Sequence, residues 1–361
     1  MATTISCLCG SSRQTVSLLS PNPWTNVSLC HCDTCRHTTG QLFVSYIGIA
    51  SPSSLENLSV YSPSTSRRIY YFCATCGCHV FRRSADNPTW EVGTGVITHS
   101  PDLPSNNPPE LGWHHEHVDA TKDGGLSIWL GPPPPPPLTA SDSDTLSASC
   151  HCQEVSFTIT RPSPGISTAP KSGFSDLIHP FKTTPQSIVS NPQDIKWWLC
   201  HGNPPSKVDP DKFPTHYLSG TCACRSCRLI SGFEIQSWAF IPRKNIFSPS
   251  LPNTPPKPLE FSQHPLRLKS YESSKGVLRD FCPTCGATVF WHDKWHRPDL
   301  IDVSVGLFKS PDGIRHKSWL AWFTDRVSFA EDVDLDRTGG CAEWAKRLVG
   351  ELQVGMIGTE T

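Results

Sequence analysis

The chain has 361 residues, which is enough for two domains of ordinary size, each with its own hydrophobic core. Its 31 basic and 32 acidic residues nearly cancel, so charge gives no reason to expect binding to nucleic acid or to an anionic membrane. No apolar run reaches the length of a membrane span. The amino-terminal residues show no signal-peptide pattern, so we expect a cytoplasmic or nuclear protein.

The cysteines are numerous and closely paired. Of the 17 cysteines, five pairs are spaced i,i+2 and four are spaced i,i+3, whereas random placement gives about one pair at any fixed spacing. Such pairing is typical of metal sites, because a tight turn aims two thiolates at one ion. The alternative is the disulfide framework of a secreted protein, which the expected reducing compartment disfavours.

One cysteine pattern is written twice. It consists of a C-x-C pair, then a C-x-C-x-x-C-R segment (the knuckle), then C-x-x-C-G. The first copy has Cys7 and Cys9, the knuckle Cys30, Cys32, Cys35 and Arg36, and finally Cys73, Cys76 and Gly77. The second copy has Cys150 and Cys152, the knuckle Cys222, Cys224, Cys227 and Arg228, and finally Cys282, Cys285 and Gly286. The repetition predicts two tandem domains.

The segments around the first copy favour strands. Alternating or β-branched and aromatic stretches predict strands at 14–19, 42–49, 68–72, 80–82 and 90–96. Residues 68–72 and 80–82 flank the C-x-x-C turn and should form a hairpin of the zinc-ribbon kind. Residues 100–125 are rich in Pro, Asn and Gly and are expected to form a loop carrying His114, His115 and His117. The predicted class is therefore mainly β.

Six consecutive prolines begin at Pro132, and polyproline is a stiff spacer that cannot join a sheet interior. We therefore expect a first domain at 1–130, a linker at 131–146 and a second domain at 147–335. The wider cysteine spacing of the second copy predicts inserts near 161–215 and 248–258, both as surface loops. Further strands are expected at 233–241, 288–291 and 301–305. The tail, 336–361, should contain a short helix packed against its own domain.

Counting ligands divides the seven thiols of each copy into two sites. A C-x-C turn and a distant C-x-x-C-G turn can clasp one zinc ion from opposite sides. The structural sets are then Cys7, Cys9, Cys73 and Cys76, and Cys150, Cys152, Cys282 and Cys285. The glycine after each last cysteine allows the positive φ that such a turn often needs.

Each knuckle then offers three thiolates. Three protein ligands and one open position are typical of a catalytic zinc. A zinc ion held by three thiolates is a weak Lewis acid, but it binds another soft donor such as a substrate thiolate well. The alternative is a structural site whose fourth ligand is a histidine, for which His114, His115 and His117 are candidates. Cys78, Cys200 and Cys341 fall outside both patterns and are expected to be buried or incidental thiols.

In combination these motifs resemble the glutathione-dependent formaldehyde-activating enzyme and centromere protein V family. The resemblance rests on Cys7 to Gly10, the two knuckles with Gly40 and Gly232 four residues after the arginine, and the two Phe-Cys-x-x-Cys-Gly segments. It implies two β-tent zinc-binding domains, a reactive zinc at the knuckle, and condensation of glutathione with formaldehyde, a carbon–sulfur lyase activity. The copies depart from the pattern at Ala223 (against His31), Tyr70 (against Arg279) and Gln153 (against Gly10).

Two functions remain open on the sequence. The leading one is a zinc enzyme acting on a thiol adduct, with the thiolates of Cys30, Cys32, Cys35, Cys222, Cys224 and Cys227 acting through bound metal. In that case Arg36 and Arg228 would hold an anionic substrate group, although a structural ion pair is an equal alternative. The rival is a zinc module that binds proteins through the linker and Trp197-Trp198. An exchangeable zinc position distinguishes the enzyme from the module.

Overall fold

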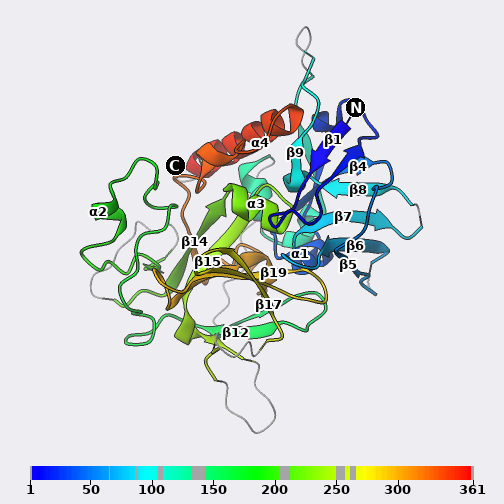
Figure 1. Cartoon of the computed structure of the whole chain (residues 1–361). Coiled ribbons are helices and arrows are strands. Elements are labelled where there is room, and N and C mark those ends of the chain that lie inside the picture. Colours follow the sequence, from blue (N-terminus) through cyan, green and yellow to red (C-terminus); the bar gives the residue numbers. More distant parts are fainter. Residues whose placement is uncertain are drawn as a thin grey trace.

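The computed structural model describes residues 2–64, 66–86, 88–104, 109–131, 143–202, 212–248, 257–260 and 266–358. The mainly β fold and the two tandem domains are confirmed. Most of the linker (132–142), most of the smaller insert (249–256) and part of the larger insert (203–211) lie outside the described residues. Figure 1 shows the first domain in blue and cyan beside the second in green to orange.

Two sheets build the first domain. The smaller has the order β2 (Gln14–Ser17), β1 (Ala2–Ile5), β9 (Ile97–His99). The larger has the order β10 (Trp113–Glu116), β3 (Val27–Cys30), β4 (Val44–Ile49), β8 (Trp90–Gly93), β7 (His79–Ser84), β6 (Arg68–Cys73), β5 (Leu58–Tyr61). The predicted hairpin is β6–β7. The predicted loop around the histidines is wrong at 113–116, because these residues pair in parallel with β3.

The second domain repeats this strand order. Its smaller sheet is β16 (Ile246–Phe247), β12 (Ser156–Thr160), β11 (Thr145–Ser149), β21 (Phe308–Lys309). Its larger sheet is β13 (Leu199–Cys200), β14 (His216–Cys222), β15 (Gln236–Pro242), β20 (Leu300–Ser304), β19 (Thr288–Asp293), β18 (Val277–Phe281), β17 (Lys269–Ser274), with β22 (Leu320–Trp322) parallel to β14. The β22–β14 pair repeats the β10–β3 pair, so the duplication extends to the parallel edge.

The helices are short except at the carboxyl end. The α-helices are α1 (Asp33–Thr39), α2 (Gln186–Val189), α3 (Arg225–Ser231) and α4 (Gly340–Gly358). The 3₁₀ turns are η1 (Pro23–Thr25), η2 (Thr94–Val96), η3 (Val118–Thr121), η4 (Gly125–Trp129), η5 (Arg243–Asn245), η6 (Val305–Leu307) and η7 (Ala330–Asp332). The predicted tail helix is α4, and its apolar side is buried.

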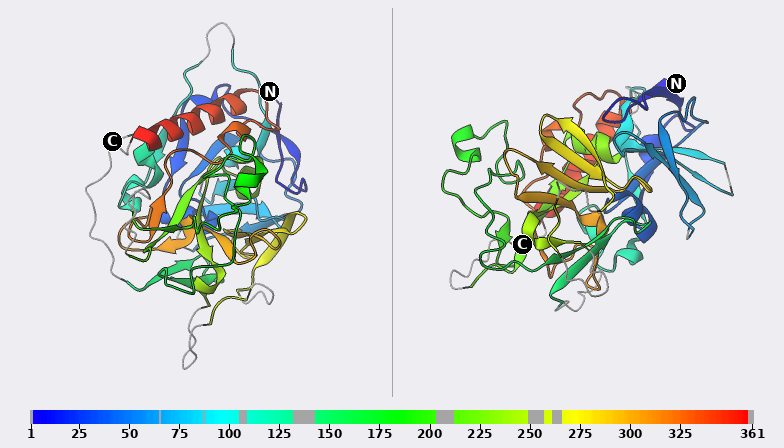
Figure 2. Two further views of the ribbon diagram at one scale, coloured as in Figure 1. Left: turned by 90° about the vertical axis from the view of Figure 1, so that its left-hand side faces the viewer. Right: turned by 60° about the horizontal axis from the view of Figure 1, so that its bottom comes forward.

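The sequence predicts that the tail helix packs against its own domain. In the structure it contacts both domains instead. In Figure 1, α4 runs along the upper side of the molecule beside β9, and the left view of Figure 2 shows it lying across one end. The ring of Trp344 packs against that of Trp24, with centroids 5.7 Å apart, and its N–H donates to the carbonyl of Gly112; both partners belong to the first domain. Gln353 accepts a hydrogen bond from the backbone of Val327 in the second domain. The helix therefore joins the two domains.

The two domains also pack directly, in a nearly reciprocal way. The backbone N–H of Leu8 donates to Leu229, and that of His151 donates to His37. Gly77 and Gly286, the glycines of the two C-x-x-C-G turns, both have φ of +79°. A Cβ on Gly77 would lie 2.5 Å from Phe281, and the corresponding atom on Gly286 would lie 2.6 Å from Phe72. These glycines are thus required by the turn and by the interface.

Candidate metal centres and cavity

The structure brings together all fourteen predicted metal ligands in the predicted groups. The donor atoms of each structural set lie within 4.8 Å of one another, as do those of each knuckle. In the first set, the sulfurs of Cys7 and Cys9 are 3.4 Å apart and those of Cys9 and Cys73 are 3.5 Å apart. A Zn–S bond of about 2.3 Å places tetrahedral sulfur ligands roughly 3.8 Å apart. The thiol spacing therefore fits a tetrahedral metal.

Each knuckle is a strand end followed by a capped helix. Cys30 ends β3, and the thiol of Cys32 is the N-cap of α1, accepting a hydrogen bond from the backbone of Cys35 at 3.4 Å. Cys224 caps α3 in the same way. Gly40 and Gly232 end the two helices in the left-handed conformation. The strand end and the capped first helical turn therefore bring the three thiols of each knuckle together.

The first knuckle is covered by aromatic rings. Cys30 and Cys35 are buried among Tyr46, Tyr70 and, from the second domain, Phe233. The thiol of Cys35 lies 3.3 Å from the hydroxyl of Tyr70. The large side chains leave this knuckle enclosed by protein on the side that faces the second domain.

Among the three candidate histidines, His117 is the one that approaches the first knuckle. Its ring, the carboxylate of Glu116 and the thiol of Cys30 have donor atoms within 4.8 Å of one another. His115 instead is joined by a 2.9 Å hydrogen bond to His31. Burial, with a smaller effect of His115, lowers the pKa of His31 to about 3, so this ring is neutral at physiological pH.

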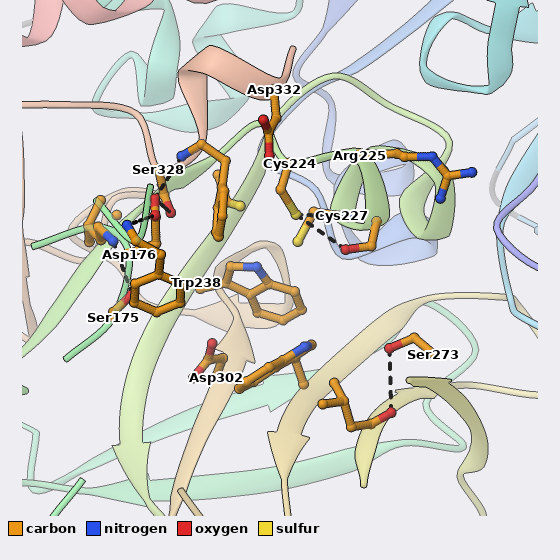
Figure 3. A pocket seen from close by; sticks show the side chains of 18 of the residues that line it. Ser175, Asp176, Cys224, Arg225, Cys227, Trp238, Ser273, Asp302, Ser328 and Asp332 are labelled. Carbon is orange, nitrogen blue, oxygen red and sulfur yellow. Dashed lines mark hydrogen bonds between the residues drawn. The ribbon is translucent and has the colours of Figure 1, made fainter. Parts of the chain in front are cut away.

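The second knuckle opens into a cavity of about 440 Å³. In Figure 3 the labelled side chains of Cys224, Cys227, Trp238 and Asp302 surround the same hollow. Buried Arg279 also lines it, donating at 3.6 Å to the thiol of Cys227 and at 3.0 Å to the hydroxyl of Ser226. Although burial lowers the pKa of Arg279, the nearby thiolates outweigh this and raise it, so its positive charge faces the knuckle.

Asp302 is a functional candidate that the sequence analysis missed. Its side chain is nearly buried, one oxygen accepts from Arg297 at 3.2 Å, and the other has no hydrogen-bond partner among the described residues. Burial raises the pKa of Asp302 to about 6, against the opposing charge of Arg297. The signal was present, because Asp302 is the single charge in the apolar stretch 300–305.

The register of the strands shows how the two knuckles differ. In the first domain Tyr70 faces Arg82, which faces Glu91, and in the second Arg279 faces Trp291, which faces Asp302. Glu91 is saturated by two hydrogen bonds from Arg82, at 2.6 and 3.0 Å. Among the described residues, an arginine that donates to a knuckle thiol and a carboxylate with an unpaired oxygen are therefore found in the second of these two arrangements, whereas Arg82 of the first lies near Cys35 but donates to Glu91.

Comparison with known proteins now identifies the family. The family model described as glutathione-dependent formaldehyde-activating enzyme matches residues 2–111 and 209–325, more than half of the chain. The chain belongs to this family. No curated protein and no solved structure matches it. No helix among the described residues has the length and apolarity needed to cross a bilayer.

The two knuckle arginines of this family member contact the opposite domain. Arg36 donates to the carbonyls of Gly306 and Phe308 at 3.0 and 3.1 Å, and pairs with Asp33 at 2.7 Å. Arg228 donates at 2.6 Å to the carbonyl of Gly95. Neither lines the cavity at Cys224. Arg36 thus has the ion pair of the structural alternative, whereas the acceptors of Arg228 among the described residues are carbonyls. A substrate-binding role for these arginines stays a prediction.

Most of the larger insert, residues 161–208, lies between the two regions that match the family model. It was expected to be a surface loop, but Trp197 and Trp198 are buried in a separate hydrophobic cluster with Phe174, Leu177, Leu218 and Phe240. These tryptophans are therefore unavailable as the contact surface of a binding module. Ser175, Asp176, Leu177 and Phe181 of the insert line the cavity.

Proposed function

We propose that the second knuckle is the reaction centre of a zinc-dependent enzyme of the carbon–sulfur lyase type. Its substrate would be the adduct of a thiol such as glutathione with a small aldehyde or a related electrophile. The observation that carries the proposal is the opening of Cys222, Cys224 and Cys227 into a cavity that also holds Arg279 and Asp302. Family membership supports the same chemistry.

Zinc fits the four thiol groups, and at the second knuckle it would supply a position for a soft sulfur donor. The chain's own residues would supply the rest. Arg279 holds positive charge against the thiolates, which favours an anionic sulfur beside them. The walls of the cavity keep the thiol and the carbon to which it bonds close together, which removes much of the entropic cost of their reaction.

Asp302 would move the proton. In adduct breakdown, its carboxylate takes the proton of the adduct hydroxyl, the electron pair of that O–H bond forms the second bond of the carbonyl, and the C–S pair leaves with the sulfur as thiolate. In the reverse direction, the thiolate attacks the carbonyl carbon and the resulting alkoxide takes a proton from the carboxylic acid. A pKa of about 6 suits both directions near neutral pH.

The test is exchange between glutathione plus formaldehyde and their adduct, followed by NMR and corrected for the spontaneous reaction. We expect catalysis by the wild type, a loss of at least about tenfold in Cys224→Ala, and little change in Cys200→Ala, which removes a buried thiol outside the four groups of candidate metal ligands. Zinc analysis should show one ion for each of the four thiol groups. Equal exchange in wild type and Cys224→Ala would support the binding module instead.

A further inference from the structure

The cavity at the second knuckle has an aromatic wall that a one-carbon electrophile does not need. Its rings come from β15, β19, the larger insert and the segment before η7. They are Trp238, Phe240, Trp291, Phe181 and Phe329. Formaldehyde contributes only one carbon to an adduct, and glutathione is polar. Rings on several sides therefore indicate an additional apolar group in the ligand.

Part of this wall is built and fixed by the insert. The carboxylate of Asp176 is buried and accepts from the backbones of Phe181 and Phe329 at 2.8 and 2.9 Å, and from Ser328 at 3.0 Å. The rings of Phe181 and Phe329 meet edge to face at 5.9 Å. Phe329 has a φ of +54°, a strained conformation that these contacts hold. One carboxylate thus positions two rings that line the cavity.

The sheet beneath is shaped to receive the insert. A Cβ on Gly220 of β14 would lie 2.3 Å from the side chain of Leu177, so only glycine admits Leu177 at this depth. The strand register places Ser28 of β3 at the corresponding position of the first domain, opposite Tyr46 as Gly220 is opposite Trp238. Of the five rings in the wall, Phe181 and Phe329, the two that Asp176 positions, lie outside the regions that the family model matches.

We propose that the insert makes the second site selective for thiol adducts whose carbon part carries an aromatic ring or a similarly large apolar group. This substrate class rests on the proposed function of the same site. The sulfur would lie at Cys222, Cys224 and Cys227, and the apolar group would lie against Phe181, Phe329 and Trp238. Burying one such group corresponds to roughly 10- to 100-fold tighter binding.

The test compares two stable probes, S-benzylglutathione and S-methylglutathione, by calorimetric titration of the zinc-loaded full chain. We expect the benzyl conjugate to bind roughly 10- to 100-fold more tightly. In Phe181→Ala, its affinity should fall roughly fivefold or more while that of the methyl conjugate is unchanged. Ile188→Ala is the matched control, because Ile188 lies in the same insert, is 45% exposed against 47% for Phe181, and does not line the cavity.

The outcomes separate this inference from the proposed function. Equal affinity for the two conjugates, no binding of either, or an equal effect of Phe181→Ala on both would overturn the aromatic selectivity, even if small adducts are turned over. Tight binding of the benzyl conjugate that depends on Phe181, with no turnover of any adduct, would support the selectivity and refute the lyase.

Discussion

Replacing Asp302 with asparagine should remove the pH dependence of catalysis and most of the rate. With a pKa of about 6, the ionised fraction of Asp302 rises about tenfold from pH 5 to pH 7. The rate of adduct breakdown should follow it and level off above pH 7. Asp302→Asn has nearly the same shape but cannot take the proton, so we expect kcat to fall about 10²- to 10⁴-fold.

The same carboxyl predicts a linked effect on stability. The charged groups that face Asp302 are Arg297, Arg279 and His292, and together they lower its pKa less than burial raises it. A folded-state pKa above the unfolded value of 3.8 means that the ionised form destabilises the fold. The unfolding free energy of the wild type should therefore fall, relative to that of Asp302→Asn, by about 2 kcal/mol as pH rises from 4 to 7.

The assays are the pH profile of kcat and urea unfolding at several pH values. Asp299→Asn is the control, because Asp299 immediately precedes β20, pairs with Arg243 and does not line the cavity. Asp299→Asn should keep both changes of the wild type near pH 6, the step-like rise in kcat and the fall in unfolding free energy. A step of the same size in Asp302→Asn, or a loss of rate below about threefold, would refute the role of Asp302 in proton transfer.

Three further substitutions test other parts of the account. Arg279→Met should keep all bound zinc by elemental analysis but lose roughly 10- to 100-fold in kcat, because the knuckle loses its charged donor; loss of zinc would show a structural role instead. Arg337→Met breaks a fully buried ion pair and should lower the urea unfolding free energy by about 3–5 kcal/mol, whereas Arg347→Met on the surface should change it by less than about 1 kcal/mol. Gly77→Ala should lower the urea unfolding free energy by about 2–5 kcal/mol, because the backbone is strained and the new Cβ overlaps Phe281. Gly10 has a similar φ but open space around it, so Gly10→Ala should lower the unfolding free energy by only about 1 kcal/mol. Equal decreases in the two variants would contradict the close packing at the interface.

The four groups of converging thiols and the β hairpins could be predicted because their signals are local. The spacing of Cys30, Cys32 and Cys35 fixes a strand end, a helix cap and a first helical turn, which are neighbours in the chain. Because the second copy repeats the C-x-C and C-x-x-C-G turns in the same order, the two distant turns could be assigned to one site. The residues 68–73 and 79–84 likewise alternate within a single hairpin.

The features that escaped prediction depend on contacts between the domains or across the insert. The carbonyl acceptors of Arg36 could not be predicted, because they are 270 and 272 positions away in the chain. Likewise, the sequence predicts the apolar face of α4, but it does not show that this face lies against both domains. The sequence around Trp198 does not show whether this side chain is buried or exposed for binding, because its neighbours in the hydrophobic cluster are distant in the chain. Asp302 is different, since a lone carboxylate in an apolar strand could have been recognised.

The most direct test of the central claim is thiol binding at the second knuckle, measured on the cobalt(II)-substituted full chain. Adding glutathione should increase the thiolate-to-cobalt charge-transfer absorption by the amount for one added sulfur ligand per chain. The increase should persist in Cys32→Ala and disappear in Cys224→Ala. No increase in the wild type, or an increase that survives Cys224→Ala, would contradict an open metal position at the second knuckle.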